Sequence, residues 1–361
     1  MIETIIIIIL LQLTVYLFQL FLLTKIFKNN PAIDTTSNLG ISIIVAARDE
    51  EQNIKTVIKY LKNQQYPNEL FEVILVDDNS SDSTFSTVQN EIMELNNFFV
   101  YKNEEKTLPG KRGALQYGIS KSKFNFILIT DADCQPQTNW INSFSSKFNQ
   151  GNDFLIGIAP FLKSSGLANL FSRYENFKNN LLSFFLIEIG FPYTAAARSF
   201  GFSKENFYKL NGYKNTTDTL SGDDDLLLRE AVKNKFKISS VIEKDSMVFS
   251  ETKRTLKEYF IQRSRHTQSS HVYLLSHKII LSFWYFLNII SDFSIWLSFV
   301  NPLFMLIFLA KFLFAIIYII VFDSKFGYSF LWREFFIGEL TYSYLLIIHF
   351  INSIFQKPKW K

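Results

Sequence analysis

The chain has 361 residues and a net charge of +4, from 37 Lys and Arg against 33 Asp and Glu. So small a positive excess does not indicate nucleic-acid binding, and 48% hydrophobic residues exclude a disordered or low-complexity protein. The single cysteine, Cys134, excludes an intramolecular disulfide framework and a cysteine-rich zinc site. The positions of the apolar residues therefore carry most of the information about the class of protein.

The first long apolar segment runs without a charge from Thr4 to Thr24. As a helix it would cross roughly the 30 Å hydrocarbon core of a bilayer. Its isoleucine run has no polar face, which disfavours a buried amphipathic helix. Lys25 and Lys28 follow, and no small-residue cleavage site comes after them. We therefore expect an uncleaved membrane anchor over residues 1–28, with the cytoplasm on the lysine side.

Two further apolar stretches occur near the other end. Ile279 to Val321 contains only Asp292 and Lys311 as charged residues, and Phe335 to Ile354 contains only Glu339. The first stretch is too long for one membrane span, because about 20 residues suffice to cross a bilayer. We expect it to consist of two elements.

Asn301 and Pro302 are the natural point of division. Leu303 to Phe322 is the better candidate span, whereas the preceding element contains Asp292 and is expected to lie in the interface, with one span as the alternative. Cytoplasmic placement of Lys357, Lys359 and Lys361 favours one interfacial helix followed by two spans. The resulting segments are basic amphipathic or interfacial helices over 251–300, attracted to membrane lipids, and a C-terminal transmembrane region over 301–361.

Between these ends, residues 29–40 have the composition of a polar linker and residues 41–250 that of a soluble domain. Short β-branched runs at 41–46, 71–76 and 124–130 predict buried strands. Apolar residues recur at helical spacing between them: Ile54, Val57, Ile58 and Leu61, then Phe85, Val88, Ile92 and Leu95. Strands that alternate with amphipathic helices predict an α/β domain with a mostly parallel sheet. Neither a dinucleotide fingerprint nor a P-loop follows a strand.

Acidic residues gather where the predicted strands end. They are Asp49, Glu50 and Glu51 beside Arg48, then Asp77 and Asp78, then Asp131 and Asp133. Ligands bind at the carboxyl ends of strands in such sheets, and converging carboxylates repel unless a cation neutralises them. Mg²⁺ or Mn²⁺ carrying a diphosphate would do so, because these ions take carboxylate and phosphate oxygens. Asp82, just before Ser83 and Thr84, is expected to cap a helix instead.

Six motifs in order carry a family resemblance: VAARDEE, VDDNSSD, GKRGAL, DAD, SGDDDLLL and QRSRH. Between about Ile41 and His266 the chain resembles the inverting, membrane-bound family 2 glycosyltransferases, which have a GT-A fold. No single motif is specific, but their order and their flanking strands together are. The resemblance implies a GT-A domain between an N-terminal transmembrane helix and C-terminal membrane helices.

The resemblance also implies roles for residues at the donor side. The nucleotide would contact Ala46, Arg48, Glu50, Asp77 and Asp78, and which of the two adjacent aspartates faces the base stays open. Lys111 matches a basic residue near the diphosphate. Asp131 and Asp133 correspond to the DxD pair that holds Mn²⁺ or Mg²⁺ and the donor, with Asp133 the more direct metal ligand. Cys134 is expected to pack only.

Two motifs concern the transfer itself. Inversion needs a base that deprotonates the acceptor hydroxyl, and the resemblance assigns it to Asp224, with Asp223 as the alternative. Acids at a helix N-terminus also favour the helix dipole, so some of Asp223 to Asp225 are expected to cap. Gln262, Arg263 and Arg265 of QRSRH would meet the diphosphate. His266 stands where the family has Trp near the acceptor, which weakens comparison with processive polymer synthases.

The expected function is metal-dependent, inverting transfer of a sugar from a nucleotide-diphospho-sugar, with UDP as the expected nucleotide. The acceptor would be a membrane-associated lipid or glycan, and the catalytic domain of this integral membrane protein would lie in the cytoplasm. A polyprenyl-phosphate sugar synthase is one alternative. A catalytically inactive membrane scaffold or transporter is the other, disfavoured because an inactive domain has no reason to retain mutually repelling carboxylates.

Overall fold

The computed structural model describes residues 2–28, 38–105 and 107–355, which form two compact units. The sheet unit comprises described residues of 38–162 and 192–252, and the membrane-helix unit comprises 2–28, 163–191 and 253–355. The expected domain of residues 41–250 is thus interrupted, since 163–191 group with the apolar helices. Most of the expected linker, 29–37, and the three terminal lysines, Lys357, Lys359 and Lys361, lie outside the described residues.

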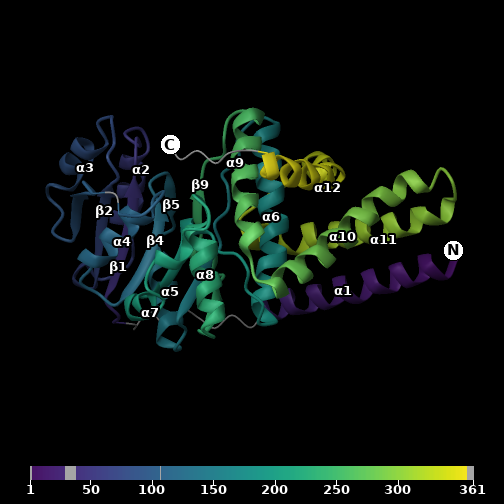
Figure 1. Cartoon of the computed structure of the whole chain (residues 1–361), viewed down its shortest axis with the longest axis horizontal. Coiled ribbons are helices and arrows are strands. Elements are labelled where there is room, and N and C mark those ends of the chain that lie inside the picture. The colour runs from purple at the N-terminus through teal and green to yellow at the C-terminus, as the bar shows by residue number, and fades with distance from the viewer. Residues whose placement is uncertain (1, 29–37, 106, 356–361) are drawn as a thin grey trace. The chain divides into compact units, whose positions relative to one another are not determined.

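The sheet unit contains a seven-stranded sheet in the order β3-β2-β1-β4-β7-β6-β8 (Figure 1). Its strands are β1 (Ile41–Ala47), β2 (Phe71–Asp77), β3 (Phe98–Lys102), β4 (Phe126–Asp131), β6 (Phe154–Gly157), β7 (Phe200–Ser203) and β8 (Ile238–Val241). Strands β3, β2, β1 and β4 are parallel, and β7 is antiparallel to both β4 and β6. A small second sheet pairs β5 (Cys134–Pro136) with β9 (Val248–Ser250). The predicted α/β architecture with a mostly parallel sheet is confirmed.

The described residues of this unit form six α-helices: α2 (Ile54–Lys62), α3 (Thr84–Ile92), α4 (Arg112–Lys121), α5 (Trp140–Asn149), α7 (Lys204–Lys209) and α8 (Asp223–Lys233). The predicted apolar face of α2 is buried in the core. Helix α4 packs very close to the sheet, since a Cβ at Gly118 would lie 2.7 Å from Ile44 Cγ2 and 3.0 Å from Val76 Cγ2. This glycine lets the helix approach β1 and β2, and the start of α4 reaches the carboxyl edge of the sheet.

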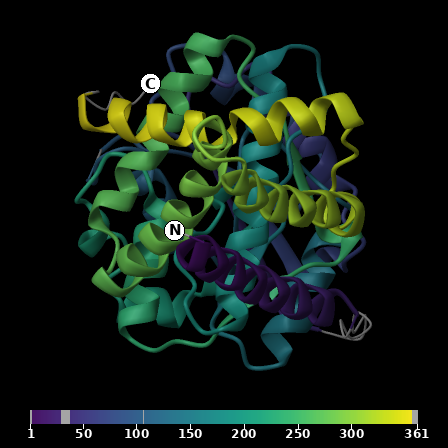
Figure 2. The ribbon, with the colours of Figure 1, turned by 90° about the vertical axis from the view of Figure 1, so that its right-hand side faces the viewer.

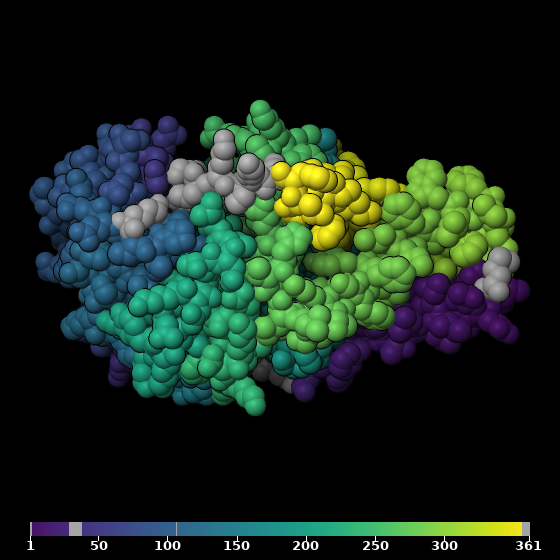
Figure 3. All heavy atoms as spheres, in the orientation of Figure 1, coloured from purple at the N-terminus to yellow at the C-terminus, as the bar shows by residue number. Residues whose placement is uncertain are grey.

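The membrane-helix unit consists of α1 (Ile2–Lys28), α6 (Leu167–Glu188), α9 (Leu256–Gln268), α10 (Leu275–Leu297), α11 (Met305–Phe322) and α12 (Trp332–Phe355). Four of its helical segments are long and apolar enough to cross a membrane: Ile2–Lys28, Leu275–Leu297, Pro302–Phe322 and Trp332–Phe355. Helices α1 and α12 lie on opposite sides of the α10–α11 pair (Figure 2), and the atoms of α1 run alongside those of α11 (Figure 3).

A buried ionic cluster joins the helices of this unit. Lys311 Nζ on α11 lies 2.5 Å from Asp292 Oδ1 on α10 and 2.8 Å from Glu339 Oε1 on α12. Lys178 Nζ on α6 lies 3.1 Å from Glu339 Oε2, which also accepts the Tyr174 hydroxyl. Two amines thus balance two carboxylates. The charge of Asp292, which favoured an interfacial position for α10, is neutralised by Lys311, and α10 satisfies the length and hydropathy of a span.

Removal of the shared cation should destabilise this unit strongly. Lys311→Met leaves Asp292 and Glu339 buried with less compensating charge, and breaking such a pair costs about 3–5 kcal/mol. We expect a clearly lower melting temperature for the detergent-solubilised protein. Lys25→Met, which removes an exposed lysine from α1, is the matched control. Equal melting temperatures for the two variants would contradict a stabilising role of the cluster.

Candidate active site

Strand register brings the predicted acids together. Ala46 on β1 pairs with Asp131 on β4, and Ala47 pairs with Asp77 on β2. Because these three strands are parallel, both aspartates lie at the same carboxyl edge of the sheet. The predicted convergence of acidic side chains therefore exists in the folded chain.

The two adjacent aspartates after β2 have different surroundings. Asp78 is buried and accepts a hydrogen bond of 2.8 Å from Asn103 Nδ2. Asp77 is also buried and accepts from the Ser80 amide through Oδ2, at 3.3 Å, but its Oδ1 has no hydrogen-bond partner among the described residues. A buried acceptor without a donor is costly unless a ligand supplies one. Asp77 is thus the better placed of the two to accept from a bound molecule.

Residues after β1 form a turn against the start of α3. Glu50 accepts from Asn53 Nδ2 at 2.7 Å, and its amide donates to Thr84 Oγ1 at 2.8 Å. Arg48 Nε lies 3.9 Å from the neighbouring Asp49. Asp82 accepts from the Thr84 amide at 2.9 Å, but the N-cap residue of α3 is Ser83, so Asp82 pairs with the first turn from one position before the predicted cap.

Lys111, immediately before α4, connects two of the predicted motifs. Its Nζ lies 2.9 Å from Asp131 Oδ1 and 3.5 Å from Asp223 Oδ2. Burial lowers the pKa of Lys111, but the nearby Asp131, Asp223 and Asp224 outweigh burial and raise it above its ordinary value. The amine is therefore a permanent cation between the end of β4 and the start of α8.

Asp131, Asp133 and Cys134 offer ligand atoms within 4.8 Å of one another. Burial raises the pKa of Asp133, and Asp131 and Glu50 raise it further, against the opposing charge of Arg198. Such crowding is what a bound divalent cation would relieve, and both carboxylates are partly exposed, so this pair fits Mn²⁺ or Mg²⁺. Burial also raises the pKa of Cys134, which keeps its thiol protonated and consistent with the predicted packing role.

The three acids at the start of α8 face different partners. Asp223 is buried beside Lys111, and Asp225 accepts from the Thr194 hydroxyl at 2.7 Å and the Ala195 amide at 3.1 Å. Asp224 is partly exposed and accepts from the Ala197 amide at 2.7 Å. Burial, Asp225 and Asp223 raise the pKa of Asp224 well above its ordinary value. A carboxylate with a raised pKa can accept a proton near neutral pH.

Arg112 is a residue of this site that the sequence analysis missed. It is fully buried, and its guanidinium donates to Thr216 Oγ1, Leu220 O and Ser221 O at 3.1 to 3.2 Å. Gly110 adopts a φ of 68°, and a Cβ there would lie 2.8 Å from Leu220 O. Both features hold the segment that leads into Asp223 against Lys111. The GKRG sequence offered a signal, since its first glycine, Gly110, and its second basic residue, Arg112, have these roles.

Comparison with known proteins gives a family match for one segment of the chain. Residues 42–204 match the model of the family described as glycosyl transferase family 2. Residues 42–204 are therefore similar to the family 2 glycosyltransferases. The predicted resemblance is thereby confirmed for the segment that bears the strands, Lys111 and the DxD pair.

Individual relatives match parts of the chain. The beta-monoglucosyldiacylglycerol synthase of Trichormus variabilis is 36% identical over 95 residues, which are 26% of this chain and 20% of that protein. The GalNAc(5)-diNAcBac-PP-undecaprenol beta-1,3-glucosyltransferase of Campylobacter jejuni is 26% identical over 132 residues, 37% of this chain and 42% of that protein. The chain thus matches less than half the length of either relative.

A solved structure extends the likeness in fold to both units. The mannosyltransferase of Pyrobaculum calidifontis, solved with GDP-Man and Mn²⁺, has a TM-score of 0.61 and 16% identity. The match covers 98% of this chain and 100% of that one. This agreement supports the GT-A fold with flanking apolar helices that the resemblance implied.

The last motif of the family 2 resemblance lies in the membrane-helix unit. Gln262, Arg263, Arg265 and His266 are on α9, where His266 is exposed and the other three are partly exposed. Arg263 Nε lies 2.6 Å from Glu175 Oε2 on α6, and Glu175 also contacts His349 Nε2 on α12 at 2.9 Å. Within its own unit, therefore, Arg263 has a carboxylate partner that the sequence analysis did not anticipate.

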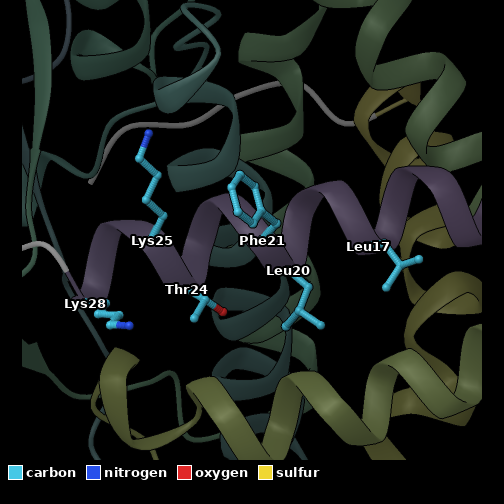
Figure 4. Close-up of a pocket in the computed structure, with 6 residues that line it drawn as sticks. All are labelled: Leu17, Leu20, Phe21, Thr24, Lys25 and Lys28. Carbon is cyan, nitrogen blue, oxygen red and sulfur yellow. The ribbon is translucent and has the colours of Figure 1, made fainter.

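A concavity of about 510 Å³ lies on the exposed face of α1 (Figure 4). Its lining residues are Leu17, Leu20, Phe21, Thr24, Lys25 and Lys28. It has an apolar wall and two amines at one end, and no carboxylate among these six.

Loss of one carboxylate of the DxD pair should weaken the binding of both the cation and the nucleotide. Asp133→Asn removes a charged ligand from the pair that fits the metal, so calorimetry with UDP and Mn²⁺ should give affinities lower by at least about tenfold. Asp245→Asn, at an exposed position of the same unit, should leave both affinities unchanged. Unchanged binding by a folded Asp133→Asn variant would reject this carboxylate as a ligand.

Proposed function

We propose that the chain is a metal-dependent, inverting glycosyltransferase that moves a sugar from a UDP-sugar to a membrane-associated lipid or glycan. The observation that carries the proposal is the arrangement around Lys111. Its amine joins Asp131 of the DxD pair to Asp223, and the partly exposed Asp224 follows directly. The groups proposed for donor binding and for base catalysis thus lie together within the sheet unit.

The donor would bind at the ends of β1 and β2. The free Oδ1 of Asp77 is a suitable acceptor for the uracil N3–H, and Ala46, Arg48, Glu50 and Asp78 complete the proposed nucleotide contacts. Asp131 and Asp133 would hold Mn²⁺ or Mg²⁺, and a bound divalent cation supplies charge neutralisation for a leaving diphosphate. The Mn²⁺ and GDP-Man in the Pyrobaculum mannosyltransferase are consistent with a metal-bound nucleotide sugar.

Asp224 would accept the proton of the acceptor hydroxyl as that oxygen attacks the anomeric carbon. Its partial exposure and its raised pKa support this role. Asp223 is buried against Lys111, so its charge is already used to hold the cation. Asp225 holds the loop at Thr194 and Ala195, which positions the segment beside the base.

Several features support an acceptor at the membrane. Among the described residues, four helical segments satisfy the length and hydropathy of membrane spans, and the names of the two reported relatives refer to a glycolipid and to a lipid-linked glycan. The concavity on α1 supports contact with membrane lipids. We propose that Gln262, Arg263 and Arg265 approach the donor diphosphate and His266 the acceptor, as the family motif implies.

The base assignment separates an active transferase from an inactive scaffold. Asp224→Asn preserves shape but cannot accept a proton, so transfer should fall by the roughly 10²- to 10⁴-fold typical of general-base loss, with donor binding unchanged. Asp223→Asn should lower the rate of transfer less than Asp224→Asn does. Activity assays and UDP calorimetry on both variants measure the difference. If only Asp223→Asn loses transfer activity, the base is Asp223 and the Asp224 assignment is wrong. If neither substitution lowers transfer, the motif serves only as a helix cap.

The proposed organisation is a membrane anchor over 1–28, a cytoplasmic catalytic domain over 41–250 interrupted at 163–191, interfacial helices over 251–300 and a transmembrane region over 301–361. Lys25 and Lys28 at the end of α1 support this orientation, because positive charge favours the cytoplasmic side.

Cysteine labelling of intact cells tests the orientation. Cys134 is buried, so an introduced cysteine can be read against a low background. Glu94→Cys, at an exposed position of the sheet unit, should react with an impermeant maleimide only after the cells are permeabilised. Glu3→Cys, at the opposite end of α1, should react with the same maleimide before the cells are permeabilised. Labelling of Glu94→Cys from outside would reject the cytoplasmic placement.

A further inference from the structure

Arg198 is a cation of the sheet unit that has no assigned role. It lies in a short 3-10 turn, Ala197–Ser199, and is partly exposed. Its guanidinium carbon is 4.2 Å from the centre of the Phe161 ring, and its Nη1 donates to Ser250 Oγ at 2.5 Å. Among the described residues it makes no ion pair within 4.0 Å. The ring and the hydroxyl therefore hold the guanidinium in place, and no carboxylate of the described residues lies within ion-pair distance of it.

The turn that carries Arg198 connects the proposed base to the proposed metal pair. The amide of the preceding Ala197 donates to Asp224 Oδ2 at 2.7 Å. On the other side, Ser250 pairs with Cys134, the residue after Asp133, in the β5–β9 sheet. Arg198 is close enough to Asp133 for its charge to act on that carboxylate. It thus lies where a group bound between base and metal would be.

Lys111 and Arg198 differ in how far their charge is already paired. Lys111 contacts both Asp131 and Asp223, which together neutralise it. Arg198 donates one N–H to the Ser250 hydroxyl and stacks one face of its guanidinium on Phe161. Its other N–H groups can donate to an anion. A planar guanidinium matches two phosphate oxygens better than an ammonium does.

We propose that Arg198 binds the phosphate that is bonded to the sugar and that leaves with the nucleotide. This inference rests on the proposed function. In the transfer, the acceptor oxygen forms a bond to the anomeric carbon and gives its proton to Asp224. The bond from that carbon to the phosphate oxygen breaks, and its electron pair stays on the phosphate. Arg198 stabilises the negative charge that this phosphate gains.

Nucleotide binding with and without the second phosphate tests the contact. Calorimetry with Mn²⁺ should compare UDP with UMP, and GDP with GMP. Arg198→Met should weaken diphosphate binding by about 10- to 100-fold, the usual worth of a hydrogen bond to a charged group, and leave monophosphate binding almost unchanged. Arg198→Lys should lie between, because it keeps the charge but loses the planar fork. Arg229→Met is the control, since its guanidinium is already paired with Asp218 and Glu230.

The outcomes separate this inference from the proposed function. If the wild-type chain binds none of these nucleotides with Mn²⁺, the donor assignment fails and this inference with it. If it binds the diphosphates but Arg198→Met, at an unchanged melting temperature, keeps the wild-type preference for diphosphate over monophosphate, the inference alone fails. A variant with a raised KM for the acceptor only would place Arg198 on the acceptor side and would also overturn it.

Discussion

The site depends on the balance of charge at the carboxyl edge of the sheet. Parallel pairing of β2, β1 and β4 brings Asp77 and Asp131 to one edge, and the turn after β4 adds Asp133. Carboxylates in such proximity would repel one another without compensation. Lys111 supplies part of this compensation. Its amine reaches Asp131 because Gly118 lets α4 pack closely against β1 and β2. A core-packing feature thus helps to determine where this cation lies.

Much of the sheet unit could be predicted from local patterns. The runs at 41–46, 71–76 and 124–130 are buried and β-branched, and they correspond to β1, β2 and β4. The antiparallel β6 and β7 were not predicted, because they have four residues each and gain stability from partners far along the chain. Gly201 on β7 is one example. A Cβ there would lie 2.7 Å from Leu128 and 2.8 Å from Phe144, which no sequence window reveals.

The acids could be located by motif, but their individual surroundings could not. Sequence alone left open which of Asp77 and Asp78 faces the base. In the structure Asp78 accepts from Asn103, whereas Oδ1 of Asp77 has no hydrogen-bond partner among the described residues. The helix α6 was missed as part of the membrane-helix unit, because its polar residues resemble those of a soluble helix. Their partners, such as Glu339 for Lys178, come from the distant α12. Long-range charge pairing of this kind leaves no local pattern.

A donor screen with the full-length protein in lipid tests the account most directly. Radiolabelled nucleotide sugars would be supplied with Mn²⁺ or with EDTA, and the label would be followed into membrane lipid or glycan. The account predicts that the sugar of one UDP-linked donor is transferred with inverted anomeric configuration, and that EDTA abolishes the transfer. Transfer that is equal in EDTA, or no transfer from any nucleotide sugar to membrane lipid or glycan, would contradict it.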